Sequence, residues 1–355
     1  MGNQLLDIWD QGALTEFIKI HAENIRKQAG GEEDFSFDAE AILPTVTHNG
    51  RTAKLRIQEV VPTGMAHLKA PGATPALWTK TQNLREEVIE LIDIDEFHRV
   101  DPITMLQLES PDPAIAAEQT WTLADRGADQ KDRNALRTEW MRWQALRGTL
   151  VANFPNAGAA TIDYGIPVGN FPTFTTPWTD TAGADPIEDL WALGAVALPV
   201  SGVYLPLYHM NSVTYRYLRR NENIKDALSS YGRNVFMPTD KDLRDLLREG
   251  TAWKIVDSGY PPEGSTDYEL TKWIDDGEIL ATTANYRYNN RRIGEVLDGW
   301  VLVGDPSGKE RPIAKQGEQA EWIYHRQGQQ TLLRYASARI PRLVAPQTIA
   351  WGTAF

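Results

Sequence analysis

Apolar side chains recur at helical spacing along two stretches of the chain. Residues 12–27 predict an amphipathic helix. The second stretch, residues 114–151, contains no proline and carries one continuous apolar stripe. The stripe consists of Leu136, Trp140, Trp143, Leu146 and Leu150. We expect it to anchor the long helix against a sheet of C-terminal strands, so that truncating a buried Trp140 would cost about 3–5 kcal/mol.

The length of this second helix sets it apart from ordinary helices. At 1.5 Å per residue, about 38 residues would extend roughly 57 Å, which exceeds the diameter of a small domain. Such a helix predicts an elongated subunit built along one central element. Gly127 and Asp129 could interrupt it, in which case a shorter helix would begin near Asp132.

Before the long helix, the pattern is typical of strands. Residues 42–46 and 53–57 are strand-like, with an Asn49–Gly50 turn signal between them. Strand character returns at residues 88–94. The first part of the chain therefore combines a helix with several strands.

After the long helix, strands and short helices are mixed. Strands are predicted at residues 161–164, 203–210, 254–257, 278–282, 300–303, 321–324, 332–336 and 349–351. A helix is predicted to begin at Pro186 with Asp185 as its N-cap. Further helices are predicted at 213–228 and at 240–249, the latter capped by Asp240. The fold class is therefore α+β.

Composition narrows the possible functions. The 355 residues include 36 basic and 48 acidic side chains, which gives a net charge of −12. This balance argues against a protein that reads DNA sequence, because such proteins present a basic face. The absence of cysteine excludes disulfides, thiolate metal sites and a cysteine nucleophile. The 12 tryptophans favour extensive buried surfaces, some of them between subunits. No signal peptide or membrane-spanning segment is predicted.

Candidate catalytic and metal-binding residues are few. Residues 304–309 resemble a phosphate-binding loop, but they are one residue short and Glu310 follows, so a hairpin turn is predicted. An acidic stretch contains Glu86, Glu87, Glu90, Asp93, Asp95, Glu96 and His98. Its alternation with apolar residues favours a solvated strand face over a metal site. A hydrolase that uses Asp93 and Glu96 stays open as an alternative. His209 is expected in a core, and we expect no cofactor or metal.

Two clusters combine arginine with tyrosine. Their arginines are Arg216, Arg219 and Arg220 in the first, and Arg287, Arg291 and Arg292 in the second. Either cluster could stack on single-stranded nucleic acid. Because the chain is acidic, and because arginine and tyrosine are enriched at protein interfaces, we favour contacts with neighbouring subunits.

An ordered set of short motifs lies within residues 132–190. It runs from R-T-E-W-M at 137–141 and Q-A-L-R-G at 144–148 to I-D-Y-G at 162–165, W-T-D at 178–180 and D-P-I-E-D-L at 185–190. In this order the chain resembles the lambda gpE-like family of tailed-phage major capsid proteins. The N-terminal order of a helix, Ile42-Leu43-Pro44 and a strand is similar as well.

The resemblance implies an HK97-type capsid fold. It assigns residues 1–45 to an N-terminal arm, 46–100 to a region with the extended E-loop, 101–190 to a peripheral domain with the spine helix, 191–300 to an axial domain, and 301–355 to strands that return to the peripheral domain. Because the predicted first helix leads directly into the arm, we expect no large cleaved segment and a separate scaffolding protein.

The resemblance also implies a function. The chain would be a structural protein, not an enzyme, that assembles through pentamers and hexamers into an icosahedral virion shell around double-stranded DNA. Its partners would be a scaffolding protein and a portal, and a decoration protein is left open. Assembly would occur in the cytoplasm of the bacterial host. A cellular nanocompartment shell of the same fold, and the carboxylate hydrolase, remain alternatives.

Overall fold

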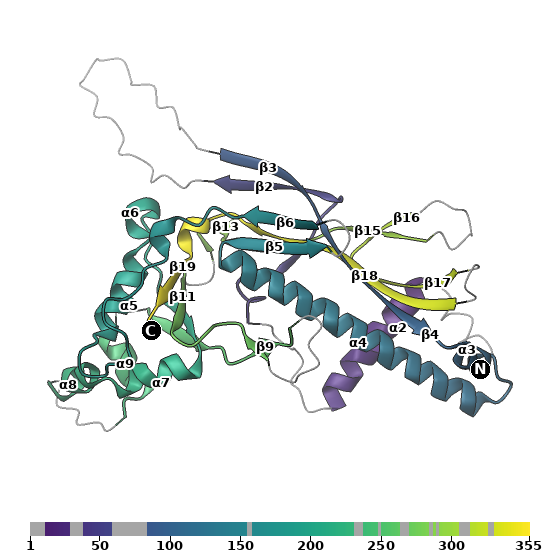
Figure 1. Cartoon of the computed structure of the whole chain (residues 1–355), viewed down its shortest axis with the longest axis horizontal. Coiled ribbons are helices and arrows are strands. Elements are labelled where there is room, and N and C mark those ends of the chain that lie inside the picture. Colours follow the sequence, from purple (N-terminus) through teal and green to yellow (C-terminus); the bar gives the residue numbers. More distant parts are fainter. Residues whose placement is uncertain are drawn as a thin grey trace, which may run out of the picture. The chain divides into compact units, whose positions relative to one another are not determined.

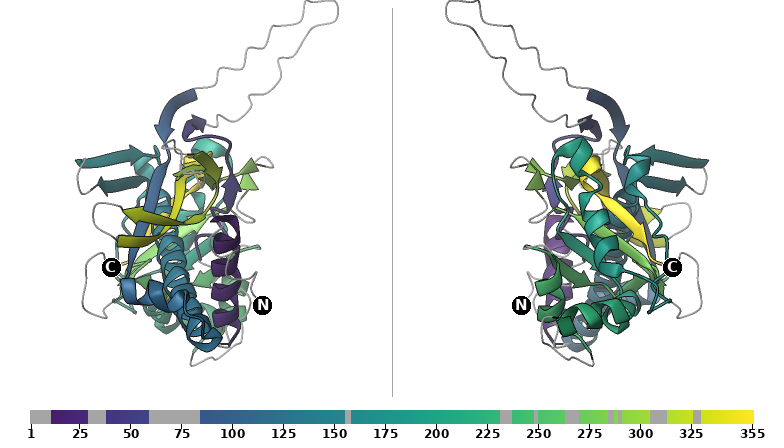
Figure 2. Two further views of the ribbon diagram at one scale, coloured as in Figure 1. Left: turned by 90° about the vertical axis from the view of Figure 1, so that its right-hand side faces the viewer. Right: turned by 90° about the vertical axis from the view of Figure 1, so that its left-hand side faces the viewer.

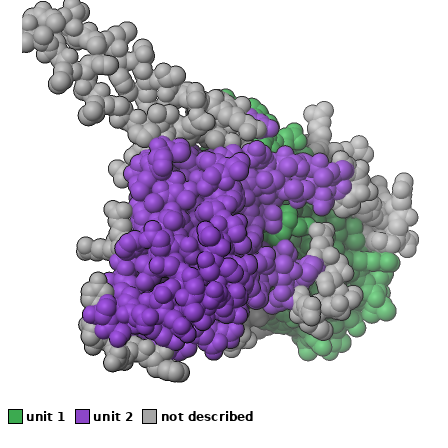
Figure 3. Space-filling view, turned by 60° about the vertical axis from the view of Figure 1, so that its left-hand side comes forward, with its two compact units in different colours: residues 1–54, 88–142, 295–342 green, residues 55–87, 143–294, 343–355 purple. Residues whose placement is uncertain are grey.

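Runs of strands and runs of helices along the chain gather into two compact units (Figures 1 and 3). The computed structural model describes residues 11–28, 38–58, 84–154, 158–230, 237–247, 250–262, 270–283, 287–288, 291–304, 313–325 and 330–355. Unit 1 consists of residues 1–54, 88–142 and 295–342, and unit 2 of residues 55–87, 143–294 and 343–355. Each unit therefore combines stretches that are far apart in the sequence.

The helices of unit 1 are dominated by the predicted long one. They are α2 (Gln11–Gln28), α3 (Pro102–Leu108) and α4 (Pro113–Leu146). α4 continues through Gly127, so the predicted interruption there is wrong. Glycine is needed at this position because a Cβ atom would lie 2.5 Å from Cδ1 of Ile18, on α2. Figure 1 shows α2 (purple) crossing α4. α4 ends earlier than predicted, because Gly148 adopts a left-handed φ of 92°.

The main sheet of unit 1 joins the N-terminal and C-terminal parts of the chain. Its strands are β1 (Thr45–Thr47), β4 (Ile92–Val100), β14 (Gly294–Asp298), β17 (Gln319–His325) and β18 (Gln330–Leu343). The order is β1-β14-β18-β17, and β4 pairs with β18 as well. β1 runs parallel to β14, whereas β18 is antiparallel to both β17 and β4.

Two further strand pairs involve predicted strands. β2 (Thr52–Gln58) pairs with β3 (Leu84–Glu90), and β15 (Trp300–Val303) pairs with β16 (Ile313–Gln316). The turn signal at Asn49–Gly50 lies between β1 and β2, but the two strands pair with other partners. The hairpin turn predicted at 304–309 lies, beyond Gly304, outside the described residues.

The helices of unit 2 are short. They are α5 (Pro186–Ala195), α6 (Leu198–Ser201), α7 (Ser212–Arg220), α8 (Glu222–Ser230) and α9 (Asp240–Leu246). The single helix predicted over 213–228 is wrong, because Asn221 leaves the helical conformation and accepts a hydrogen bond from the Ile224 backbone N–H. The predicted cap at Asp240 is also wrong. Thr239 caps α9, in a capping box with Asp242.

A four-stranded sheet forms the centre of unit 2. Its order is β19 (Ala350–Thr353), β11 (Glu278–Thr282), β7 (Leu207–Met210) and β8 (Ala252–Ile255). Separate two-stranded sheets are formed by β5 (Thr149–Phe154) with β6 (Gly158–Asp163), by β9 (Gly259–Tyr260) with β10 (Thr271–Lys272), and by β12 (Arg287–Tyr288) with β13 (Arg291–Arg292). Figure 2 shows β5 and β6 as a distinct hairpin.

Each unit has its own hydrophobic core. In unit 1, Leu14 and Ile18 of α2 pack with Leu123 of α4 and with Leu333 and Tyr335 of β18. In unit 2, the core contains Trp178, Leu190, Leu193, Tyr208, Met210 and Ile279. No helix in the described part of the chain is long and apolar enough to cross a membrane.

Candidate functional site

The residues proposed for a hydrolase do not form a catalytic pair. Asp93 and Glu96 lie three positions apart on β4, so they project from opposite faces of the strand. Asp93 accepts a hydrogen bond from Arg51 at 2.6 Å, and Glu96 forms an ion pair with Arg133 at 3.0 Å. Among the described residues, no three histidine or carboxylate side chains are placed to hold a metal ion. The acidic stretch therefore does not form one face: Asp93 and Asp95 are exposed on one side of β4, and Glu96 and His98 are half-buried on the other.

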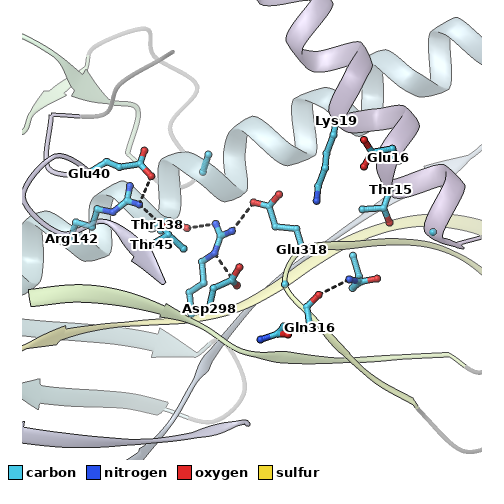
Figure 4. Close-up of a pocket in the computed structure, with 15 residues that line it drawn as sticks. Thr15, Glu16, Lys19, Glu40, Thr45, Thr138, Arg142, Asp298, Gln316 and Glu318 are labelled. Atoms are coloured by element: carbon cyan, nitrogen blue, oxygen red, sulfur yellow. Dashed lines mark hydrogen bonds and ion pairs between the residues drawn. The ribbon is translucent and has the colours of Figure 1, made fainter. Parts of the chain in front are cut away.

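A polar cavity of about 500 Å³ lies in unit 1 beneath α2 (Figure 4). Its lining consists of Gly12, Thr15, Glu16, Lys19, Glu40, Thr45, Ala135, Thr138, Arg142, Asp298, Gln316, Gly317, Glu318, Gln319 and Arg339. Three basic side chains face four carboxylates, so the opposite charges almost cancel. This balance does not favour a charged ligand. It points to an ionic cluster that holds the surrounding elements together.

Arg339 of β18 occupies one side of this cluster. Its guanidinium donates hydrogen bonds to Glu318 at 2.8 Å, to Asp298 at 3.3 Å and to the Thr138 hydroxyl at 3.0 Å. The Tyr335 hydroxyl also donates to Glu318, at 2.7 Å. The cluster therefore ties β18 to α4, to β14 and to the turn before β17.

The pKa values of the two carboxylates beside Arg339 are shifted in opposite directions. Burial raises the pKa of Asp298, and this effect outweighs the nearby Arg339 charge. Burial also acts to raise the pKa of Glu318, but Arg339, Tyr335 and Lys19 together bring that pKa below its usual range. Glu318 is therefore the carboxylate that stabilises the folded unit when ionised.

We expect Glu318→Gln to lower the stability of unit 1 at neutral pH, with a difference from the natural chain that shrinks in acid. A carboxyl group with a lowered folded-state pKa contributes stability above its unfolded pKa and loses it as the pH falls through the folded value. Urea unfolding at a series of pH values from 7 to 3 measures this difference. A gap that stays constant below pH about 4 would contradict the assignment.

Arg142 of α4 occupies the other side of the cavity. The residue is only 2% exposed. Its guanidinium donates hydrogen bonds to the Leu43 carbonyl at 3.0 Å, to the Thr45 hydroxyl at 2.7 Å and to the Glu40 carboxylate at 3.0 Å. It also pairs with Glu139 at 3.1 Å. Glu139 in turn accepts the Ala39 backbone N–H at 2.8 Å. Arg142 and Glu139 therefore clamp residues 39–45 onto α4.

α2 is held to the rest of unit 1 by contacts outside the ionic cluster. The Thr15 hydroxyl accepts a hydrogen bond from the Ala320 backbone N–H of β17 at 2.9 Å. His21 lies 2.6 Å from Asp125 of α4, and its ring contacts Trp121 at a centroid distance of 4.9 Å. The N-terminal helix is thus held by polar and aromatic contacts as well as by its apolar face.

The residues of the predicted apolar stripe differ in burial. Trp143, Leu146 and Leu150 are fully buried, whereas Leu136 and Trp140 are half-buried. The Trp143 ring stacks near Trp273, and the Leu146 carbonyl accepts the Trp351 indole N–H at 2.7 Å. The last turn of α4, residues 143–146, belongs to unit 2, and there it packs against β19 of the four-stranded sheet, which carries Trp351. The large loss of stability that we expected for truncation of Trp140 to alanine is therefore expected at Trp143 instead.

Asp185 lies at the N-cap of α5. Its carboxylate accepts a hydrogen bond from the Glu188 backbone N–H at 3.3 Å, and Pro186 occupies the first turn. In the same segment, Trp178 donates its indole N–H to Asp189 at 2.8 Å. The W-T-D and D-P-I-E-D-L motifs are therefore joined by one side-chain hydrogen bond.

Asp185→Ala is expected to lower the free energy of unfolding by about 1 kcal/mol, because it removes the cap. Asp185→Asn is the matched control, since asparagine caps about as well as aspartate. Thermal unfolding of the two variants measures the effect. Equal melting temperatures for the alanine and asparagine variants would remove Asp185 from the capping role.

The two predicted arginine clusters lie on different elements of unit 2. Arg216 and Arg220 are exposed on α7, and Arg219 donates to the Pro238 carbonyl at 2.7 Å. Arg287 and Arg292 are exposed on β12 and β13, where Arg291 also lies. His209 is buried in β7, as expected for a core residue.

Sequence reasoning missed the ionic cavity. Glu139, Arg142, Glu318 and Arg339 were not singled out, because charged side chains usually lie at the surface. One local signal was available: Glu139 and Arg142 are spaced as an ion pair on a helix and are interleaved with Trp140, Met141 and Trp143.

Known proteins resemble this chain in sequence and in fold. The model of the family described as phage major capsid protein E matches residues 63–295. A putative capsid protein of an Escherichia coli CFT073 prophage has a similar fold, with a TM-score of 0.60 at 13% identity over 97% of this chain and 99% of that one. A phage-related protein from Bordetella bronchiseptica RB50 gives a TM-score of 0.53 at 10% identity over 96% of both chains. No curated protein sequence matches the chain.

Proposed function

The chain belongs to the phage major capsid protein E family, and from this premise we propose that it forms an icosahedral shell around the double-stranded DNA of a tailed phage. The family match carries this conclusion, since it covers 63–295 and therefore reaches into both compact units. The fold is the HK97-type capsid fold of the α+β class. The chain is a shell-forming structural protein of the phage capsid.

The proposed organisation follows the order of regions along the chain. Residues 1–45 would be the N-terminal arm, 46–100 the E-loop region, 101–190 the peripheral domain, 191–300 the axial domain and 301–355 the returning strands. The clamp formed by Arg142 and Glu139 supports an arm whose end is fixed to α4. Residues 59–83, in the middle of the E-loop region, lie outside the described residues.

The proposed partners follow from a shell that encloses a genome. Copies of the chain would form pentamers and hexamers, and scaffolding and portal proteins would take part in assembly in the host cytoplasm. A decoration protein is a further option. DNA would be enclosed without sequence-specific contacts, in keeping with the net charge of −12.

Contacts between copies are proposed at exposed aromatic and basic residues. Trp121, Trp191 and Trp300 are 54%, 43% and 40% exposed, and such large rings on a surface are typical of interfaces. The exposed arginines of α7, β12 and β13 are the proposed polar contacts. Most of the described tryptophans outside this group are buried within a unit.

Sedimentation and negative-stain microscopy of the purified chain test the shell. We expect closed particles tens of nanometres across. A species that stays monomeric in every assembly condition would overturn the proposal. The nucleic-acid content of particles from infected cells separates a phage shell from a nanocompartment, which would contain protein.

A further inference from the structure

The hairpin of β12 and β13 places two positive charges side by side. In this antiparallel pair, Arg287 lies directly opposite Arg292, and Tyr288 lies opposite Arg291. Arg287 and Arg292 are both exposed. Like charges at directly opposed positions destabilise a strand pair.

The hairpin is also too small to tolerate this repulsion easily. Among the residues that the structure describes, its ladder consists of the two residue pairs given above, and isolated two-stranded hairpins are marginal even when longer. An anion placed between the two guanidinium groups would convert the repulsion into two attractions. Arginine is suited to this role, because its planar donors match a carboxylate.

Two of the three arginines of α7 differ, because residues of unit 2 already interact with them. Arg219 donates to the Pro238 carbonyl and lies over the Tyr215 ring at 5.7 Å. The pKa of Asp276 is lowered first by a hydrogen bond from Lys272 and in part by the charge of Arg216. By contrast, neither Arg287 nor Arg292 has a side-chain hydrogen bond or ion pair with any residue that the structure describes.

We propose that Arg287 and Arg292 bind carboxylates of a second copy of this chain. The proposal rests on the proposed function, because a shell places copies of the chain permanently beside one another. Each copy carries 48 acidic against 36 basic side chains, so a neighbour offers a surplus of carboxylates. The same surplus repels DNA phosphates, which makes the enclosed genome the weaker candidate. Complementary charges of this kind fix the register of an interface and speed association.

Charge variants test the contact in the full-length chain. We expect Arg287→Gln with Arg292→Gln to raise the protein concentration needed for half-maximal assembly by about tenfold or more, and Arg287→Glu with Arg292→Glu to abolish assembly. Added salt should weaken assembly of the natural chain more than that of the glutamine variant. Lys241→Gln, which removes a different exposed cation of unit 2, should assemble normally. Unchanged thermal unfolding of the unassembled subunit shows that each variant folds.

A second experiment identifies the partner carboxylate. Arg287→Lys with Arg292→Lys keeps the charges and supplies amines, which a carbodiimide couples to carboxylates in direct contact. Shells assembled from a mixture of ¹⁴N- and ¹⁵N-labelled copies distinguish cross-links between copies from those within one. We expect mixed-isotope cross-linked peptides that join the hairpin to an acidic segment.

The outcomes separate this contact from the shell itself. Absence of particles from the natural chain would refute the proposed function. Normal assembly of the glutamate variant, or hairpin cross-links confined to single copies, would overturn only the contact. Particles of the glutamate variant that form normally but contain less DNA would show that the anion is DNA phosphate, which also overturns it.

Discussion

Replacing Trp143 with alanine is expected to lower the free energy of unfolding of unit 2 by about 3–5 kcal/mol. The ring is 1% exposed and is enclosed by two other indoles, with centroids 6.3 Å away at Trp273 and 6.5 Å away at Trp351. Its removal leaves a cavity that these rigid rings cannot fill. Urea unfolding of the unassembled subunit, followed by near-ultraviolet circular dichroism, measures the loss.

Two other tryptophans provide the controls. Trp191→Ala removes a ring of the same unit that is 43% exposed, so its cost should stay below about 1 kcal/mol. Trp140→Ala should fall between the two, because that ring is half-buried and lies under the Arg137 guanidinium at 5.0 Å. Equal costs at Trp143 and Trp191 would show that α4 is not anchored by Trp143.

Arg142→Ala is expected to cost about 3–5 kcal/mol as well, for an electrostatic reason. The change leaves the fully buried Glu139 without its cation, and it removes the donors for Leu43 and Thr45. Residues 39–45 should then detach from α4. Urea unfolding measures the cost, and hydrogen exchange of the amides in 39–45 reports the detachment.

Variants of neighbouring residues distinguish this clamp from general charge effects. Arg133→Ala removes an arginine of the same helix whose side chain is 71% exposed, so its effect should stay within about 1 kcal/mol. Adding Glu139→Gln to Arg142→Ala should recover part of the loss, because the orphaned charge disappears. The clamp would be disproved if Glu139→Gln lowered the stability of the Arg142→Ala variant by as much as it lowers the stability of the natural chain.

Local patterns predicted most of the longer helices and the positions of several strands, and the predicted bounds coincide with the observed ones at 278–282 and 300–303. The α4 stripe was recognisable because its spacing is helical whatever surrounds it. Three local signals were missed. Asn221 and Thr239 cap helices, and Thr239 with Asp242 has the capping-box spacing. Gly148 marks the end of α4, which was predicted to continue to residue 151.

Strand partners were not predictable from local patterns. The Asn49–Gly50 signal indicates a turn, but it cannot show that β1 pairs with β14, which lies about 250 residues later. The ionic cavity depends on the same distant pairings. Arg339 becomes buried, and Glu318 mostly enclosed, only when β17 and β18 pack beside α2 and α4, so no window of sequence around them reveals the cavity.

The contact between Thr15 and Ala320 has a consequence for synthesis of the chain. The two residues are 305 positions apart, so at ordinary rates of about 5–20 residues per second the ribosome needs about 15–60 s to reach the second one. During this interval the apolar face of α2 has no β17 to cover it, and it is available to chaperones or to other nascent chains. Subunits can therefore enter assembly with a docked N-terminal helix only after almost all of the polypeptide has been made.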